Sequence, residues 1–243
     1  MNFIPTFYPK VKYLIIFARL LSFWSPNNGA TNITQATRSI VWLNNDYIVV
    51  YDRATSLNSG LFKRFNLSLV THPVITGSTA TETLASGQQL FVQTLLPASP
   101  SLSAVYAAGT LNPIAQLEPT QYVFTAEDAT RPADVRFLHV LQGADPGAAM
   151  VSAIYAQSTG GTAFDGAVFG STAVYFPVST SGVFAQTALT VPTGVHTLLL
   201  TGLTASTAYG VSIQPGGAGS VITVTSGGSG AIADGAGVVR LTF

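Results

Sequence analysis

Residues 39–56, SIVWLNNDYIVVYDRATS, constrain the fold more than the rest of the chain does. Two apolar runs flank Asn44, Asn45 and Asp46, and in each run both alternate sets of positions carry apolar side chains. An alternation of period two is that of a β-strand, and apolar residues on both faces indicate a strand that is covered on both sides. Asn and Asp tolerate positive φ, so the break predicts a hairpin turn that contains Asp46.

The end of this hairpin carries unusual polar and aromatic residues. Asp52 and Arg53 close the second strand, where an acid and a base can pair at the sheet margin. Tyr47 and Tyr51 are four residues apart, so they lie on one face of the strand. We therefore expect the two rings to share one environment, either both in the core or both exposed.

Short apolar runs of strand length continue to the C-terminus, separated by Gly-Ser, Pro-Ala-Ser-Pro, Asp-Gly and Gly-Gly turn signals. The expected strands cover residues 62–69, 71–76, 88–96, 122–126, 135–141, 172–177, 187–191, 196–202, 210–213, 221–225 and 238–243. No long amphipathic helix is evident, and residues 148–157 fit a strand or a short helix equally well. The pattern predicts an all-β protein, an antiparallel β-sandwich forming one domain over residues 31–243. Within it, Tyr209 follows a Gly-Leu-Thr corner and is expected to close one end of the core.

The first 30 residues differ from the rest of the chain in their residue pattern and are expected to form a separate N-terminal extension. Lys10 and Lys12 precede YLIIFARLLSFW, an apolar run that Arg19 interrupts. A signal peptide has an earlier basic region and an unbroken apolar core, and a bilayer span needs roughly 20 apolar residues. We expect an amphipathic segment or an extra strand, and no membrane span.

Composition excludes several function classes. Only 20 of the 243 residues are charged, 10 basic and 10 acidic, and no cysteine is present. Without a basic excess the chain cannot neutralise a row of phosphates, so nucleic acid is not an expected partner. Without cysteine there are no disulfides and no thiolate metal sites. Strands rich in Ser and Thr resemble those of secreted proteins, which predicts an extracellular or periplasmic location.

Four short motifs point to a family. They are ATRSIVWLNNDYIVVYDRATS, FKRFNLSL, GQQLFVQTLLP and ADVRFLHVLQG, which occur in this order. Residues 32–243 resemble the C-terminal β-sandwich region of heparinase II/III-like polysaccharide lyases. In that family a large α-helical toroid precedes the sandwich and supplies most of the catalytic Tyr, His and Asn residues. Nothing in this sequence could form the toroid, so the resemblance implies a tail module and assigns no catalytic residue here.

The histidines and acidic residues are the candidates for catalysis and metal binding. His72, His139 and His196 each lie in or beside an apolar strand, where a structural role competes with that of a general base or zinc ligand. His139 is the candidate catalytic residue, because Asp134 and Arg136 share its strand. Three carboxylates, those of Glu127, Asp128 and Asp134, surround Arg131 and could bind calcium, but no calcium-loop spacing is present, which favours a solvated loop with an ion pair to Arg131. We predict no metal and no cofactor.

Aromatic residues are the candidates for carbohydrate binding. Sugar-binding proteins stack pyranose rings on exposed aromatic rings and hydrogen-bond the hydroxyl groups. The residues that could do this are Trp42, Tyr47, Tyr51, Asp52 and Arg53, with Asn66 and Gln88 as further polar candidates. The competing interpretation is that most of these rings fill the core.

Three functions remain open. The first is an auxiliary glycan-contacting module of a polysaccharide-degrading system. The second is an autonomous glycan lyase or hydrolase with a site built on loops, although the G-x-S-x-G motif of many hydrolases is absent. The third is a self-associating structural protein, because zero net charge promotes association into homo-oligomers.

Overall fold

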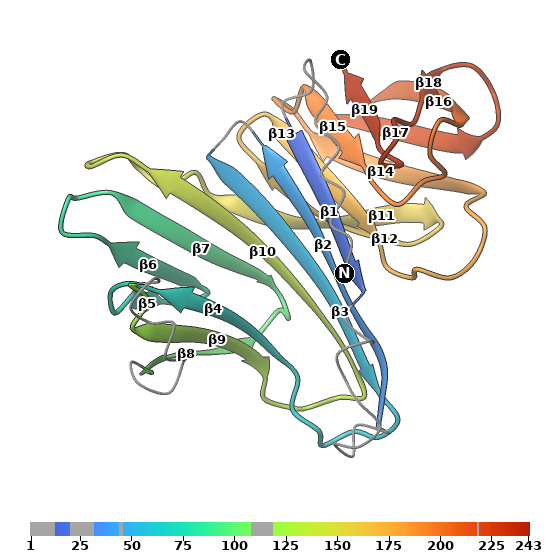
Figure 1. Cartoon of the computed structure of the whole chain (residues 1–243). Coiled ribbons are helices and arrows are strands. Elements are labelled where there is room, and N and C mark those ends of the chain that lie inside the picture. Colours follow the sequence, from blue (N-terminus) through green and yellow to red (C-terminus); the bar gives the residue numbers. More distant parts are fainter. Residues whose placement is uncertain (1–12, 20–31, 44–45, 108–118, 218) are drawn as a thin grey trace. The chain divides into compact units, whose positions relative to one another are not determined.

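The computed structural model describes residues 13–19, 32–43, 46–107, 119–217 and 219–243. Every regular element in these ranges is a β-strand, so the all-β prediction is confirmed (Figure 1). One domain over residues 31–243 stays a prediction. The chain divides into two compact units, Met1–Met150 and Val151–Phe243. We call them unit 1 and unit 2 and describe each by itself.

Unit 1 is a sandwich of two antiparallel sheets. One sheet has seven strands in the order β1-β2-β3-β10-β7-β6-β5, and the other has three in the order β4-β9-β8 (Figure 1). The strands are β1 (Tyr13–Arg19), β2 (Ile33–Leu43), β3 (Tyr47–Ser56), β4 (Arg64–Leu69), β5 (Val74–Thr76), β6 (Thr79–Thr83), β7 (Gln89–Leu96), β8 (Pro100–Tyr106), β9 (Tyr122–Asp128) and β10 (Asp134–Ala144).

The core of unit 1 lies between these two sheets. Val50, Val92 and Phe137 of the larger sheet pack with Phe65 and Phe124 of the smaller one, and all five are buried. Each of these strands contributes alternate residues, as the period of two requires. The alternation of residues along these strands therefore correctly predicts which side chains point into the core between the two sheets.

The hairpin at residues 39–56 forms as predicted. β2 and β3 pair antiparallel, with Val41 opposite Val49, and Asp46 lies in the turn. The other turn residues, 44–45, lie outside the described residues. Most of the predicted extension, residues 1–12 and 20–30, also lies outside them. Tyr13–Arg19 forms β1, which pairs antiparallel with β2 and thus corresponds to the extra-strand alternative.

Unit 2 is one nine-stranded sheet that curls around its own core. The strand order is β18-β16-β17-β14-β11-β12-β13-β15-β19, and the edge strands β18 and β19 contact each other. Among the strand pairs described, only β13 and β15 run parallel. The strands are β11 (Ala153–Gly161), β12 (Phe164–Phe169), β13 (Thr172–Pro177), β14 (Gln186–Pro192), β15 (Thr197–Leu200), β16 (Ala208–Gly216), β17 (Gly219–Ser226), β18 (Ala231–Ile232) and β19 (Val239–Thr242).

Tyr209 closes the core of unit 2 as the sequence predicted. Its ring is 2% exposed, and its hydroxyl group accepts a hydrogen bond of 2.9 Å from the backbone N–H of Thr204. A tyrosine that bonds back to the chain a few residues upstream fixes the corner between two strands. This corner belongs to the scaffold of unit 2.

Candidate functional site

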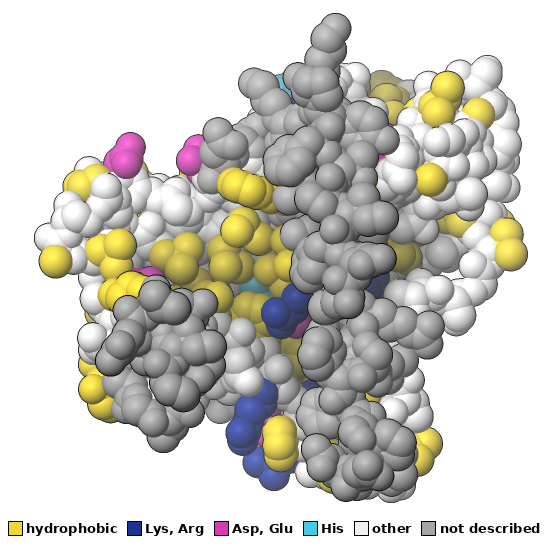
Figure 2. Space-filling view, in the orientation of Figure 1, with side chains coloured by type: hydrophobic (Ala, Val, Ile, Leu, Met, Phe, Trp, Pro, Cys, Tyr) yellow, Lys and Arg dark blue, Asp and Glu magenta, His cyan; other side chains and the backbone are white. Residues whose placement is uncertain are grey.

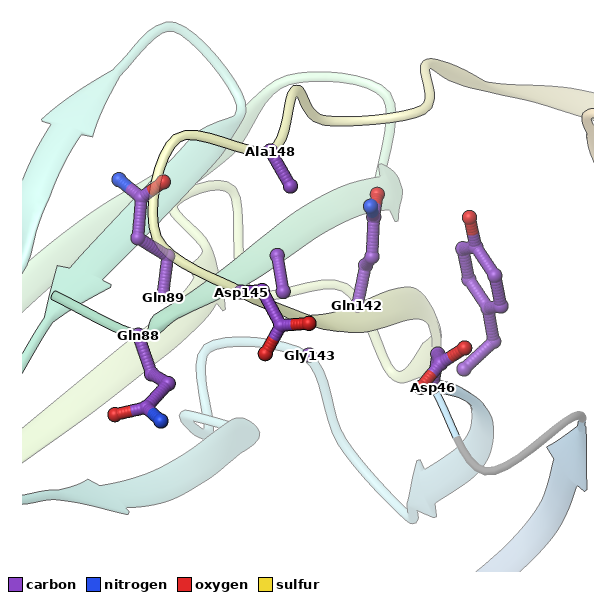
Figure 3. Close-up of a pocket in the computed structure, with 9 residues that line it drawn as sticks. Asp46, Gln88, Gln89, Gln142, Gly143, Asp145 and Ala148 are labelled. Carbon is purple, nitrogen blue, oxygen red and sulfur yellow. The ribbon is translucent and has the colours of Figure 1, made fainter.

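An open cleft with a volume of about 470 Å³ lies at one end of unit 1 (Figure 3). It is lined by the β2–β3 turn, the β6–β7 turn and the end of β10. The lining residues are Asp46, Tyr47, Gln88, Gln89, Gln142, Gly143, Ala144, Asp145 and Ala148. A concave site with a few convergent polar groups is the usual form of a ligand site.

Antiparallel pairing brings these distant residues together. Gln142 of β10 lies opposite Tyr47 of β3, and Ala144 of β10 lies opposite Gln89 of β7. The starts of β3 and β7 therefore lie beside the end of β10, at one end of the strands of the larger sheet. The backbone N–H of Gly143 donates a hydrogen bond of 2.8 Å to the carbonyl of Asp46, which holds the turn against β10.

Three glutamine side chains give the cleft its polarity. Gln88 accepts a hydrogen bond from the hydroxyl of Ser86, and Gln89 Nε2 donates to Thr83 Oγ1 over 3.3 Å. Gln142 Nε2 donates to the carbonyl of Ala149 over 3.2 Å. A side-chain amide has two donors and an acceptor with two lone pairs. Gln88 and Gln89 are thus oriented by these bonds and keep the capacity to bind hydroxyl groups.

Tyr47 supplies an aromatic ring at the cleft. Its side chain is half-buried, and burial together with the nearby negative charge of Asp46 raises the pKa of its hydroxyl group. Figure 3 shows Asp46 on one side of the cleft, Gln88 and Gln89 on the other, and Asp145 between them. The site thus combines one aromatic ring with amides and carboxylates.

Gly87 holds the β6–β7 turn against the loop that follows β10. Its φ of 89° lies in the left-handed region, and a Cβ atom there would lie 3.1 Å from side-chain atoms of Pro146. We expect Gly87→Ala to lower the free energy of unfolding by about 1–2 kcal/mol and by more than Gly147→Ala does, because an L-residue is strained at this φ and its Cβ would also press on Pro146. Denaturant unfolding measures the loss. Gly147→Ala, at a φ of 80° with no atom within 4 Å, is the matched control, and an equal loss there would show that the Pro146 contact adds nothing.

The two tyrosines of β3 differ in exposure, so the expectation that they share one environment is wrong. Tyr51 is fully buried in the middle of the strand, whereas Tyr47 stands at its beginning, beside the turn. The guanidinium of Arg53 lies 4.4 Å from the centre of the Tyr51 ring. Two side chains on one face of a strand can differ in exposure, because the end of the strand is covered by fewer neighbouring residues than its middle.

Asp52 and Arg53 do not pair with each other. Consecutive residues of a strand point to opposite faces. Asp52 instead accepts two hydrogen bonds from Arg38 of β2, 2.8 Å from Nε and 2.6 Å from Nη2. Burial raises the pKa of Asp52, and the hydrogen bonds and charge of Arg38, then the charge of Arg53, oppose that rise.

Trp42 does not join the cleft either. It is 42% exposed but lies opposite Ile48, on the sheet face away from Tyr47. Of the five residues proposed for carbohydrate binding, the structure thus places Tyr47 alone in the cleft. Gln88 joins it there, whereas Gln89, Gln142 and Asp145 were missed. Gln89 begins β7, Gln142 lies near the end of β10 and Asp145 follows that strand, and only the register of β3, β10 and β7 shows that they converge.

His139 is packed inside the sandwich. Its side chain is fully buried, its ring stacks on Phe65 at 3.8 Å between centres, and Nδ1 lies 3.1 Å from Thr94 Oγ1. Nε2 has no hydrogen-bond partner among the described residues. Burial, reinforced by the positive charge of Arg38, lowers the pKa of His139 to about 3, so the ring is neutral. A general base must reach the proton that it removes, and this ring has no exposed atom with which to do so.

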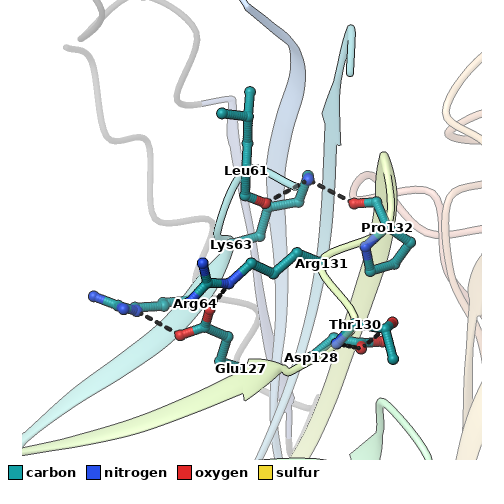
Figure 4. Close-up of polar contacts among 8 residues, drawn as sticks. All are labelled: Leu61, Lys63, Arg64, Glu127, Asp128, Thr130, Arg131 and Pro132. Atoms are coloured by element: carbon teal, nitrogen blue, oxygen red, sulfur yellow. Dashed lines mark hydrogen bonds and ion pairs between the residues drawn. The ribbon is translucent and has the colours of Figure 1, made fainter. Parts of the chain in front are cut away.

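The acidic loop forms the predicted ion pair. Arg131 Nε lies 3.1 Å from Glu127 Oε1, and Arg64 Nε lies 2.8 Å from Oε2 (Figure 4). Asp128 accepts hydrogen bonds from the backbone and side chain of Thr130. Among the described residues, no three His, Asp or Glu side chains gather as metal ligands would. His72 and His196 are both exposed.

The described part of the face in Figure 2 is mostly uncharged. On the face shown in Figure 2, polar uncharged and apolar atoms predominate over the few basic and acidic side chains. Within the described residues, no helix is long and apolar enough to cross a membrane.

Comparison with solved structures shows the fold. The chain is similar to heparan sulfate lyase HepC from Pedobacter heparinus, with a TM-score of 0.53 and 18% identity over 73% of this chain and 28% of that one. A mutant of that lyase gives a TM-score of 0.51 and 18% identity over 72% and 27% of the two chains. A heparinase III gives 0.50 and 10% identity over 70% and 26%.

At these identities the likeness concerns the fold alone, and the chain spans little more than a quarter of those proteins. No protein-family profile and no curated protein matches the sequence. The heparinase-like fold implied by the sequence motifs is therefore confirmed, at the level of architecture.

Proposed function

We propose that this chain is an auxiliary glycan-contacting module of a polysaccharide-degrading system, acting outside the cell or in the periplasm. The cleft of unit 1 is its contact site. The observation that carries the proposal is the convergence of Tyr47 with Gln88, Gln89 and two carboxylates at the end of the sandwich. An aromatic ring can stack on a sugar face while amides and carboxylates bind the hydroxyl groups.

The fold supports the same proposal. The solved structures that this chain resembles include lyases of heparan sulfate, and we propose that the chain corresponds to the C-terminal β-sandwich region of such enzymes. The buried position of His139 favours the auxiliary role over an autonomous catalytic one. Its neutral ring is enclosed by Phe65 and Thr94 and is separate from the cleft lining.

A binding screen tests the proposal. The full chain is titrated against a panel of neutral, amino, uronic and sulfated oligosaccharides, and each mixture is also read for the ultraviolet absorbance of unsaturated products. We expect saturable binding of at least one glycan without product. Product formation would contradict the auxiliary role and support the lyase alternative. Absence of binding across the whole panel would contradict any glycan contact, and light scattering at several concentrations would then test self-association.

A further inference from the structure

The cleft contains two carboxylates that have no hydrogen-bond or ion-pair partner among the described residues, those of Asp46 and Asp145. All other described carboxylates have such a partner: Asp52, Glu82, Glu127, Asp128, Asp134, Asp165 and Asp234. The chain is poor in charge, so two unpaired carboxylates in one open cleft are a specific feature of this site.

Among the described residues that line the cleft, none is basic. The described basic residues along β10 lie toward its other end: Arg136 is the third residue of the strand. Near that end Arg64 and Arg131 pair with Glu127, and Lys63 donates a hydrogen bond to the carbonyl of Pro132 (Figure 4). Arg131 precedes β10 and Asp145 follows it. With 11 residues at ~3.3 Å per residue, the strand separates the two ends by roughly 35 Å.

From this charge pattern we infer that the cleft selects cationic or uncharged sugars, of the hexosamine class, and rejects uronate and sulfated sugars. The inference rests on the proposed function and adds the class of ligand. Ammonium, amide and hydroxyl groups donate hydrogen bonds to carboxylates, and charge-assisted bonds are the stronger ones. A sulfate or uronate group would meet two negative charges, with no arginine or lysine among the described lining residues to offset them.

Three tetrasaccharides with one β-1,4-linked glucosamine backbone test the inference on the full chain. Their amino groups are free, N-acetylated or N-sulfated, so the group at that position is cationic, neutral or anionic on an otherwise identical backbone. We expect the free amine to bind most tightly, the N-acetyl form next, and the N-sulfated form at least about tenfold more weakly than the free amine, and we expect the difference to shrink at high salt. Tyr47→Ala should weaken the first two.

Charge variants assign the preference to the cleft. The double change Asp46→Asn and Asp145→Asn should bring the free amine and the N-sulfated form to within about threefold of each other, because it removes the attraction and the repulsion together. Asp128→Asn, which removes a carboxylate at the other end of unit 1, should leave the ratio unchanged. If Arg64→Gln abolishes binding of the N-sulfated form and Tyr47→Ala leaves it unchanged, the anion binds near Arg64, at the other end of unit 1. This result would support the inference.

Two results would overturn the inference, and they differ in meaning. If the N-sulfated form binds as well as the free amine and Tyr47→Ala weakens both, the cleft binds glycans without the proposed selectivity, and the inference alone fails. If none of the three tetrasaccharides nor any glycan of the wider panel binds, the proposed function fails and the inference fails with it.

Discussion

Replacing Arg38 with methionine is expected to lower the free energy of unfolding by about 3–5 kcal/mol, because it leaves the buried carboxylate of Asp52 without its partner. Asp52 is 9% exposed, and Arg38 contacts it through both Nε and Nη2. Burial already raises the pKa of Asp52, and loss of Arg38 should raise it further. Trp42 of β2 lies in unit 1, so denaturant unfolding followed by tryptophan fluorescence reports on this unit.

Arg64→Met is the matched control for this prediction. Arg64 also donates to a carboxylate, that of Glu127, but its side chain is 42% exposed. Exposed ion pairs contribute about 0–1 kcal/mol, so this variant should unfold close to the wild type. A loss below about 1 kcal/mol for Arg38→Met, or an equal loss for the two variants, would contradict the account of the buried pair.

His139 is expected to make unit 1 sensitive to acid. In the folded chain the pKa of His139 is lowered to about 3 by burial and then by the charge of Arg38, whereas an unfolded histidine titrates near 6.5. Between these two pKa values, His139 therefore binds a proton in the unfolded state and stays neutral in the folded state. The stability from neutral His139 is present above pH 6.5 and is lost as the pH falls, by about 2–3 kcal/mol between pH 6.5 and pH 4.5.

A variant separates this effect from that of the carboxylates. His139→Phe removes the titrating ring while keeping an aromatic ring against Phe65, whose centre lies 3.8 Å from that of His139. The free energy of unfolding, measured at several pH values from 7 to 4.5, should fall less steeply for this variant than for the wild type. Parallel curves for the two proteins would show that His139 does not carry the acid sensitivity.

The sequence predicted the elements whose period of two is unbroken. The β2–β3 hairpin, β7 and β10 were predicted because their alternation is regular and their turns carry Asn, Asp or Gly. No strand was predicted at β12, because the Asp165-Gly166 dipeptide has the composition of a turn. In the structure both residues lie inside the strand, where Asp165 accepts a bond from Tyr155 and a Cβ at Gly166 would lie 2.5 Å from the Tyr175 ring.

β8 was missed for a related reason. Its first residue, Pro100, belongs to a segment that has the composition of a turn, but an edge strand tolerates proline at its first position. The division into two units was also beyond the sequence, because strand signals of the same kind continue across residue 150. Local pattern indicates strands, whereas the assignment of strands to sheets depends on long-range pairing.

The candidate site was predictable only in part. Tyr47 and Gln88 were named from their residue types, and the structure brings both to the cleft. Asp52 and Arg53 were named for the same reason, yet alternation along β3 turns them to opposite faces, one toward Arg38 and the other over Tyr51. Residue type suggests chemistry, but register and burial decide which side chains can meet a ligand.

Two tyrosines of unit 1 test whether the cleft contacts glycans. Tyr47 lines the cleft, whereas Tyr106 is 62% exposed on β8, in the other sheet. Each is changed to alanine, and binding of the strongest glycan from the panel is measured by titration calorimetry. We expect binding to weaken about five- to tenfold or more for Tyr47→Ala, as for an aromatic contact residue, and to change by less than about twofold for Tyr106→Ala. Unchanged binding by Tyr47→Ala, or an equal loss in both variants, would contradict this expectation.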